Sequence, residues 1–254
     1  MGRLDDRVII VTGGAQGIGL AYCKGLAAEG AKVVVADIDR AASEAAAGVL
    51  GESGADALAV VGDVSNPEDT AELARATIER FGRIDGLINN AAMYQRPAMS
   101  RVPFDEIPVD EWDRLMAINL RGIFLCCRAV VPEMKRQQSG KIVNISSGTV
   151  FAGTPNLLHY VTSKAGVIGL TRGLARELGE YNITVNAIAP GLTMSMDETD
   201  DSQSEYNQQR IQARSLKRPE APEDLVGTAV FLCSSDSDFM SGQTMVVDGG
   251  LQMH

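Results

Sequence analysis

Short apolar runs alternate with longer segments in which apolar residues recur at helical spacing. Strand patterns occupy residues 7–11, 32–36, 56–61, 84–88, 141–145, 184–188 and 244–247. Helical patterns fill the intervals, at residues 19–29, 41–53, 67–81, 112–138, 157–179 and 222–233. This alternation predicts an α/β fold: one doubly wound Rossmann-type domain over residues 1–254, with a mostly parallel seven-stranded sheet and helices on both faces.

Polar residues follow several of the predicted strands directly. Asp37, Asp63 and Asn89 each stand where a strand ends. Ligands of open α/β sheets collect outside the carboxyl ends of the strands. We therefore expect one binding site along this edge of the sheet.

The first strand runs into Thr12-Gly13-Gly14-Ala15-Gln16-Gly17-Ile18-Gly19, and a helix follows. Glycines in this setting let the backbone approach a pyrophosphate, whose charge is held at the helix N-terminus. Asp37 lies about twenty residues further on, where an acid accepts hydrogen bonds from ribose hydroxyls and repels a 2′-phosphate. This favours NAD over NADP, although Arg40 is close enough in sequence to contact a phosphate.

Tyr160 and Lys164 stand four residues apart in a helical pattern, so both side chains share one face of the helix. An ammonium beside a phenol favours the phenolate and lowers the pKa of the tyrosine. The pair is thus a candidate general acid/base near neutral pH.

Residues 192–218 depart from the repeat, since they are polar, acidic and only weakly helical after Ser202. The segment follows a strand end, and we expect it to form a mobile lid over the site.

The chain has 254 residues, with 33 acidic against 23 basic residues and a formal net charge of −10. This balance argues against nucleic acids and anionic membranes as partners. Four cysteines without a Cys-x-x-Cys pair and two histidines argue against a metal site. The start of the chain lacks a signal-peptide pattern and no apolar run approaches about 20 residues, so we expect a cytoplasmic protein outside membranes.

Five landmarks stand in a fixed order: Thr12-Gly13-x3-Gly17-x-Gly19, Asn89-Asn90-Ala91, Ser147, Tyr160-x3-Lys164 and Pro190-Gly191. Together they resemble the short-chain dehydrogenase/reductase family over essentially the whole chain. The resemblance implies hydride transfer between a nicotinamide and an alcohol or carbonyl, with Tyr160 as the acid/base. Lys164 would lower the pKa of Tyr160 and bind the nicotinamide ribose, and Ser147 would hold the substrate oxygen. Asn119 would order a water in a proton relay.

The same resemblance assigns the cofactor contacts. They are Gly13, Gln16, Gly17, Ile18 and Gly19 at the pyrophosphate, Asp37 and Ile38 at the ribose, Asp63 and Val64 at the adenine, and Asn89, Ala91, Tyr160, Lys164, Pro190, Gly191, Thr193 and Ser195 toward the nicotinamide. Position 92 departs from the family pattern, because Ala92 stands where glycine is usual, and the loop from Tyr94 to Pro103 is longer than usual.

The expected substrate is a small secondary or cyclic alcohol, or its ketone or aldehyde. Apolar or aromatic candidates for its pocket are Met93, Tyr94, Phe151, Leu157, Met194 and Met196. An NAD-dependent epimerase and an NADP-dependent 3-oxoacyl reductase-like carbonyl reductase are the alternatives. The resemblance also implies a homotetramer, and small residues at Ala165, Gly169 and Gly173 permit a second helix to approach closely.

Overall fold

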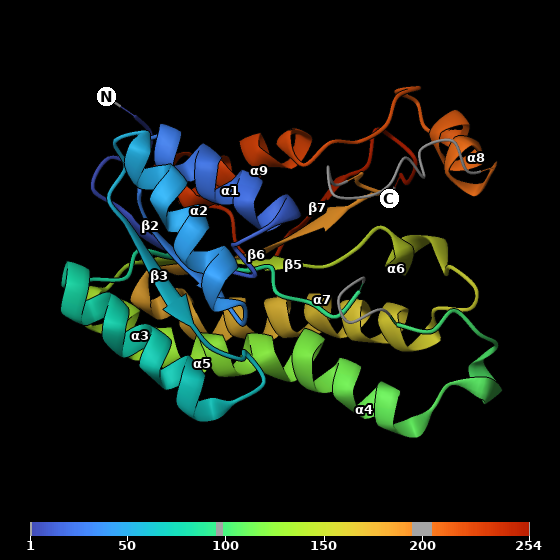
Figure 1. Cartoon of the computed structure of the whole chain (residues 1–254), viewed down its shortest axis with the longest axis horizontal. Coiled ribbons are helices and arrows are strands. Elements are labelled where there is room, and N and C mark those ends of the chain that lie inside the picture. Colours follow the sequence, from blue (N-terminus) through green and yellow to red (C-terminus); the bar gives the residue numbers. More distant parts are fainter. Residues whose placement is uncertain (1, 95–98, 195–204, 254) are drawn as a thin grey trace.

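A computed structural model describes residues 2–94, 99–194 and 205–253 of the chain (Figure 1). Its sheet has the strand order β3-β2-β1-β4-β5-β6-β7, and every neighbouring pair is parallel. The strands are β1 (Val8–Thr12), β2 (Lys32–Asp37), β3 (Ala57–Val61), β4 (Gly86–Asn89), β5 (Gly140–Ile145), β6 (Ile183–Pro190) and β7 (Thr244–Val247). The predicted sheet is confirmed, and within the described residues it is wholly rather than mostly parallel. The order reverses between β1 and β4, where ligands of such sheets bind.

Helices cover both faces of the sheet, as predicted (Figure 1). One face carries α1 (Gly17–Ala28), α2 (Arg40–Glu52) and α9 (Glu223–Cys233). The other carries α3 (Pro67–Phe81), α5 (Gly122–Gln137) and α7 (Leu158–Leu178), with α4 (Val109–Met116) leading into α5. Two shorter helices, α6 (Thr149–Ala152) and α8 (Glu205–Ala213), lie near the carboxyl ends of the strands.

Successive side chains of the central strands point to opposite faces of the sheet, which divides the core into two layers. In β1, Ile9 and Val11 pack under α1 and α9, whereas Val8 and Ile10 pack under α3 and α5. All four side chains are essentially inaccessible to solvent. Burial on both faces explains why the strands read as continuous apolar runs rather than as alternating ones.

The helix boundaries follow local chemistry. At the start of α3, the Asn66 side chain accepts a hydrogen bond from the Glu68 N–H at 2.8 Å and Pro67 occupies the first turn. The helix ends at Gly82, whose φ of 75° is the left-handed conformation that glycine adopts without strain.

The predicted helix over 112–138 is observed as one continuous run with a π-helical turn, η2 (Ala117–Arg121), between α4 and α5. This run, Val109–Gln137, is the one described segment long and apolar enough to cross a membrane, with a mean hydropathy of 1.5. Its buried apolar residues, Ile123, Cys126, Cys127, Val130 and Met134, lie in the core between α3 and the sheet. It is therefore a core helix of the fold, although the sequence led us to expect no such apolar run.

Candidate functional site

A cavity of about 780 Å³ opens along the carboxyl ends of the strands. The glycine turn after β1, the ends of β2, β3 and β4, and residues of α7 all contribute to its wall. Most of the residues predicted for the site line this cavity: Gly13, Gln16, Gly17, Ile18, Gly19, Asp37, Ile38, Asp63, Val64, Ala91, Ser147, Tyr160, Lys164, Pro190, Gly191 and Thr193.

The glycine turn is shaped by contacts that only glycine allows. Gly13 has a φ of +62°, and a Cβ there would lie 2.9 Å from the Ala91 Cα. A Cβ on Gly19 would overlap the Gly13 carbonyl oxygen. The start of α1 has no side-chain cap and no acidic residue in its first turn. Its free N–H groups can therefore hold an anion, so the turn fits the pyrophosphate of a dinucleotide.

Thr12 and Asn90 join the glycine turn to the end of β4. The Thr12 hydroxyl accepts hydrogen bonds from the backbone N–H groups of Asn90 and Ala91 at 3.0 and 3.1 Å. The Asn90 amide in turn donates to the carbonyl oxygens of Thr12 and Gly13 at 3.1 and 3.0 Å. These contacts fix the turn against the neighbouring strand.

Among the predicted cofactor contacts that the structure describes, Asn89 is the exception. Its side chain is buried and does not line the cavity, because it donates to the Asn144 side chain on β5 at 2.8 Å and contacts the Cys127 sulfur. Asn90 lines the cavity instead. Strand geometry explains the difference, since successive side chains at a strand end point to opposite sides.

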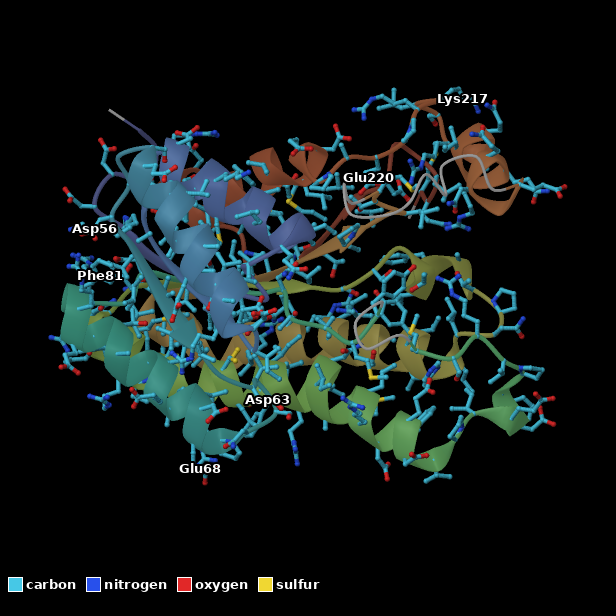
Figure 2. All side chains as sticks on the ribbon, viewed as in Figure 1. Asp56, Asp63, Glu68, Phe81, Lys217 and Glu220 are labelled. Atoms are coloured by element: carbon cyan, nitrogen blue, oxygen red, sulfur yellow. The ribbon has the colours of Figure 1, made fainter. Side chains whose placement is uncertain are left out.

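Asp37 marks the end of the cavity beside β2. Its carboxylate accepts hydrogen bonds from the N–H groups of Ala15 at 3.2 Å and Asp39 at 3.1 Å, which ties it to the glycine turn. Asp63, at the end of β3 (Figure 2), accepts a hydrogen bond from the Ser65 N–H at 2.8 Å. Both carboxylates are therefore oriented before any ligand arrives.

Tyr160 and Ser147 meet at the other end of the cavity. The Ser147 oxygen accepts hydrogen bonds from the Thr149 N–H at 3.2 Å and the Thr149 hydroxyl at 3.0 Å. Its own proton can then be donated to the Tyr160 phenol, with which it forms a hydrogen bond that lowers the pKa of the tyrosine. Burial acts in the other direction and prevails, so that the pKa of Tyr160 is raised in the chain alone.

Lys164 lies on the same face of α7 as Tyr160, with its Nζ atom 5.8 Å from the centre of the phenol ring. It is 2 % exposed and donates a hydrogen bond to the Ile145 carbonyl oxygen at 2.8 Å. Burial lowers the pKa of Lys164 to about 8. We had expected this ammonium to lower the pKa of Tyr160; in the chain alone the nearby charge that does so is that of Arg101, and the effect of burial is larger.

Asn119 lies in the π-helical turn η2 and is completely buried behind the cavity. Its side-chain oxygen accepts a hydrogen bond from the Met93 N–H at 2.7 Å, and its amide donates to the Met93 carbonyl and the Ser163 hydroxyl, each at 3.3 Å. Such turns recur at functional sites. Here the turn directs an amide that holds the segment after β4 against α7.

Met93, Tyr94, Leu157 and Met194 line the cavity, as does Ala92, where the family pattern has glycine. The first three pack with Tyr160 in one apolar cluster. The Tyr94 and Tyr160 rings lie 5.2 Å apart at 45°. Phe151 was also predicted for the pocket but does not line the cavity. It lies on the short helix α6, which the strand and helix patterns did not predict and which contributes Thr149 to the wall. The predictions for Ser195 and Met196 fall outside the described residues.

Several residues of this region were not predicted. Arg101 lies in the cavity wall beside Tyr94, and Arg214 forms a buried ion pair with Glu220 behind Thr193. A lone arginine in a loop and a pair of charges in a polar segment give no periodic signal, so the sequence offered no means to find them. No group of metal-ligating side chains occurs in the described parts of the chain.

Comparison with known proteins supports the same assignment. Residues 13–252 match the family described as enoyl-(acyl carrier protein) reductase. The chain is 38 % identical to a 3-oxoacyl-[acyl-carrier-protein] reductase of Synechocystis sp., with 100 % of both chains covered. It is also 38 % identical to levodione reductase of Leifsonia aquatica, over 98 % of this chain and 95 % of the relative.

Solved structures agree with the sequence comparison. A crystal structure of levodione reductase has a TM-score of 0.90 at 35 % identity and covers 97 % of each chain. An NAD+-bound xylitol dehydrogenase has a TM-score of 0.89 at 33 % identity, over 97 % of this chain and 99 % of that one. The chain belongs to the short-chain dehydrogenase/reductase family of alcohol and carbonyl oxidoreductases, whose members use nicotinamide cofactors.

Proposed function

We propose that the protein is an NAD-dependent oxidoreductase that transfers a hydride between the nicotinamide and a small secondary or cyclic alcohol, or its ketone or aldehyde. The observation that carries the proposal is the arrangement of Ser147, Tyr160 and Lys164 in one cavity with the glycine turn. When bound, the nicotinamide supplies the hydride chemistry. The residues of the chain must then orient the substrate and move one proton.

Tyr160 is the proton carrier in this proposal. Ser147 donates a hydrogen bond toward the same space and orients the substrate oxygen, while Tyr160 takes the alcohol proton in oxidation or returns it in reduction. A cationic nicotinamide ring beside the phenol favours the phenolate, which opposes the effect of burial on the pKa of Tyr160. Asn119 fixes the backbone at Met93 and so supports the shape of the pocket.

Two observations support NAD over NADP. The Asp37 carboxylate lines the cavity, where it would repel a 2′-phosphate. Arg40, the residue that could have offset this charge, does not line the cavity; its side chain is exposed and lies 3.5 Å from Glu44.

The proposal is tested with purified protein, NAD+ or NADP+, and a panel of secondary and cyclic alcohols, by following the absorbance of the reduced cofactor. Turnover is expected with NAD+. Tyr160→Phe should remove at least about a hundredfold of kcat and leave NADH binding within about twofold, because the phenol is needed for the proton and not for the dinucleotide. Normal turnover by this variant would refute the role of Tyr160.

A 3-oxoacyl reductase activity is a second candidate, favoured by the 38 % identity to the Synechocystis reductase over the whole chain. It would require reduction of an acetoacetyl thioester with NADPH. Faster reduction of that thioester than of any simple ketone, with NADPH preferred over NADH, would replace the first proposal by this one.

The lid proposal concerns residues 192–218. Within its described part, α8 contributes Asn207 and Arg210 to the cavity wall. A segment that reaches the site from beyond β6 can exclude water when substrate binds. Slower proteolysis of this segment in the presence of NADH and a substrate analogue would support closure.

We also propose a cytoplasmic homotetramer. An apolar groove between the α4–α5 run and α7 is lined by Met116, Leu120, Phe124, Gly166, Gly169 and Leu170. Phe124 is 47 % exposed, and a Cβ at Gly169 or Gly173 would meet open space. A second copy would cover this face. Sedimentation as a monomer would reject the proposal, and Phe124→Glu should weaken the assembly.

A further inference from the structure

Arg101 places a positive charge at the substrate end of the cavity. Its Nη2 atom donates a hydrogen bond to the Tyr94 hydroxyl at 3.2 Å, and its Cζ atom lies 5.9 Å from the centre of that ring. Tyr94 in turn packs on Tyr160. The Arg101 charge also acts on the phenol itself, since it lowers the pKa of Tyr160.

No described residue neutralises this charge. Across residues 2–94, 99–194 and 205–253, no carboxylate lies within 4.0 Å of the Arg101 guanidinium, and its one hydrogen bond is to a neutral phenol. A guanidinium offers five N–H donors, suited to binding a carboxylate through two of them. Donors therefore remain for a ligand.

We propose, on the basis of the proposed hydride transfer, that the substrate carries a carboxylate that binds Arg101 while its carbinol carbon lies beside Tyr160. The Tyr94 side chain contacts both residues, since its hydroxyl accepts from Arg101 and its ring packs on Tyr160. The carboxylate and the reacting carbon are thus separated by several bonds, as in a 4-hydroxycycloalkane carboxylic acid, and are not adjacent as in a 2-hydroxy acid.

The test compares trans-4-hydroxycyclohexanecarboxylate with cyclohexanol, which lacks the charge. The kcat/KM for the acid should be at least about tenfold higher than that for cyclohexanol. Arg101→Gln should lower the kcat/KM for the acid about ten- to a hundredfold and change the kcat/KM for cyclohexanol less than about threefold. Arg75→Gln on α3, exposed and remote from the cavity, is the matched control and should change neither.

Equal kcat/KM values for the two alcohols in the wild-type protein would overturn the proposal. So would equal losses of kcat/KM for the two alcohols in Arg101→Gln. Oxidation of other neutral alcohols with no detectable oxidation of the acid would also overturn it. Failure of every alcohol in the wider panel would instead refute the proposed function.

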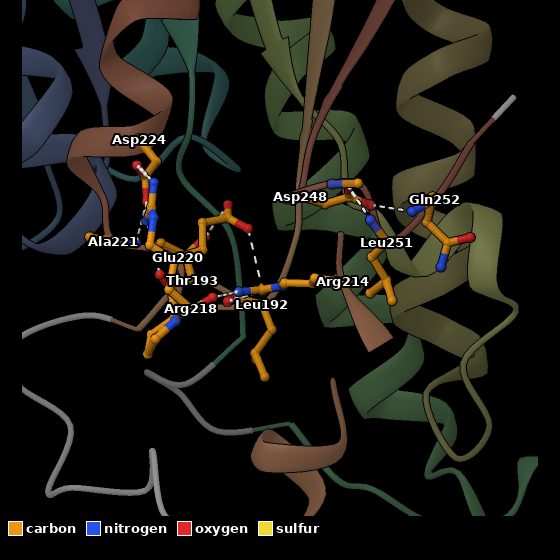
Figure 3. A network of polar contacts seen from close by, with 12 residues as sticks. Leu192, Thr193, Arg214, Arg218, Glu220, Ala221, Asp224, Asp248, Leu251 and Gln252 are labelled. Atoms are coloured by element: carbon orange, nitrogen blue, oxygen red, sulfur yellow. Dashed lines mark hydrogen bonds and ion pairs between the residues drawn. The ribbon is translucent and has the colours of Figure 1, made fainter. Parts of the chain in front are cut away.

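A second, independent observation concerns Glu220, which lies within the molecule while Lys217 lies at its edge (Figure 2). The Glu220 carboxylate pairs with Arg214 at 3.4 Å, and both side chains are at most 5 % exposed. It accepts a hydrogen bond from the Thr193 hydroxyl at 3.0 Å (Figure 3). A Cβ on Gly191 would lie 2.5 Å from it, so the carboxylate packs directly on the chain after β6.

Arg214 holds the chain after β6 from the other side. It donates to the Leu192 carbonyl oxygen at 2.7 Å and to the Arg218 carbonyl oxygen at 3.1 Å (Figure 3). The segment 191–194 is thereby held by two opposite charges that are almost completely buried. Separating the two partners would leave a buried charge uncompensated, so the paired arrangement of Arg214 and Glu220 is strongly favoured.

We infer that Glu220 is a positioning residue for the nicotinamide end of the cofactor site: its ionised form fixes Thr193 and Leu192 in the conformation that binds the dinucleotide. This inference rests on the proposed function, in which Thr193 contacts the nicotinamide. Loss of the negative charge should loosen the segment and weaken cofactor binding.

The charge is expected to change near neutral pH. Burial raises the pKa of Glu220 to about 7, although the Thr193 hydroxyl and Arg214 oppose the rise. The other groups that face Glu220 are Asp248 after β7, Arg218 on its own segment and Tyr22 on α1. Asp248 accepts hydrogen bonds from the N–H groups of Gly250, Leu251 and Gln252, so that its charge is held in its own turn.

The test is NADH binding, measured by fluorescence from about pH 6 to about pH 8. In the wild-type protein the Kd should rise about three- to tenfold as the pH falls across this range, whereas Glu220→Gln should bind more weakly at pH 8 and show no such dependence. Glu223→Gln, exposed three residues further on, should keep the wild-type profile.

Wild-type affinity and pH dependence in Glu220→Gln would overturn the inference. So would a lower melting temperature with the pH dependence of binding retained, because that result assigns Glu220 to stability alone. Absence of NADH binding by the wild-type protein would refute the proposed function instead.

Discussion

Replacing Lys164 with methionine should make the fold more stable at neutral pH while abolishing turnover. Methionine has a similar length but carries no charge, so it fills the same space beneath the Tyr160 ring. The ammonium is 2 % exposed, and its one hydrogen bond within the described residues is to the Ile145 carbonyl oxygen. The fold therefore gains no stability from this charge, which the proposed function assigns to catalysis.

The magnitude follows from the pKa. Burial lowers the pKa of Lys164 from 10.5 to about 8, a difference of about 2.5 units at 1.36 kcal/mol each. Above pH 10.5 the lysine is neutral in both states and no stability is lost. As the pH falls toward 8 the unfolded chain binds the proton first, and below 8 the folded state has lost about 3 kcal/mol.

Methionine recovers this loss but leaves the Ile145 carbonyl without its donor, which costs about 1–3 kcal/mol. The net gain at pH 7 is then about 0–2 kcal/mol, or a melting temperature up to about 5 °C higher for a chain of this size. The gain should shrink by about 2 kcal/mol between pH 7 and pH 10, because the wild-type lysine loses its proton over this interval.

Thermal unfolding followed by circular dichroism, at one protein concentration for all variants, measures both effects. Lys141→Met is the matched control, since Lys141 lies on β5 but pairs with Asp238 at 2.7 Å and is not buried without a counter-ion. It should gain no stability and keep its activity. A Lys164→Met protein that melts several degrees below the wild type at pH 7, or a gap that does not change with pH, would refute the reasoning.

Two further substitutions test the cofactor site. Asp37→Ser should lower kcat/KM with NAD+ by about tenfold and raise it with NADP+, because it removes both the ribose acceptor and the charge that repels a 2′-phosphate; an unchanged ratio in steady-state kinetics would contradict this role. Gly19→Ala should abolish NADH binding in a calorimetric titration, since its Cβ would overlap the Gly13 carbonyl oxygen. Gly48→Ala on α2, where a Cβ meets open space, should bind normally and be about 1 kcal/mol more stable.

Most of the fold could be predicted because its signals are local. The apolar runs of β1 and β2, the cap at Asn66 and the left-handed glycine at position 82 each act over a few residues. The glycine turn also has a local signal, since Gly13 and Gly17 both adopt positive φ angles. Sequence spacing also brought Tyr160 and Lys164 onto one helical face, as observed.

The structure departs from the sequence-based predictions where a contact joins segments that are distant in the chain. Whether position 89 or 90 enters the cavity depends on the pleat at the end of β4 and on Asn144, 55 residues away. The pKa of Tyr160 depends on how deeply the fold buries it, which a four-residue spacing does not reveal. The Arg214–Glu220 pair lies in a stretch that reads as solvated surface, and only the packing of that stretch against Gly191 removes it from water.

Burial has opposite effects on the pKa values of the two residues that the proposed mechanism requires. It raises the pKa of Tyr160 and so favours the neutral phenol. It also lowers the pKa of Lys164 to about 8, which leaves most of the ammonium charged at pH 7 but weakens that preference. A cationic nicotinamide beside the phenol would favour the phenolate, and ribose hydroxyls beside Lys164 would stabilise the ammonium by accepting its protons. Cofactor binding should therefore create the acid/base pair rather than find it ready. If so, NAD+ binding must release a proton from Tyr160 near neutral pH, and a titration in buffers of different ionisation enthalpy must detect it in the wild type and not in Tyr160→Phe.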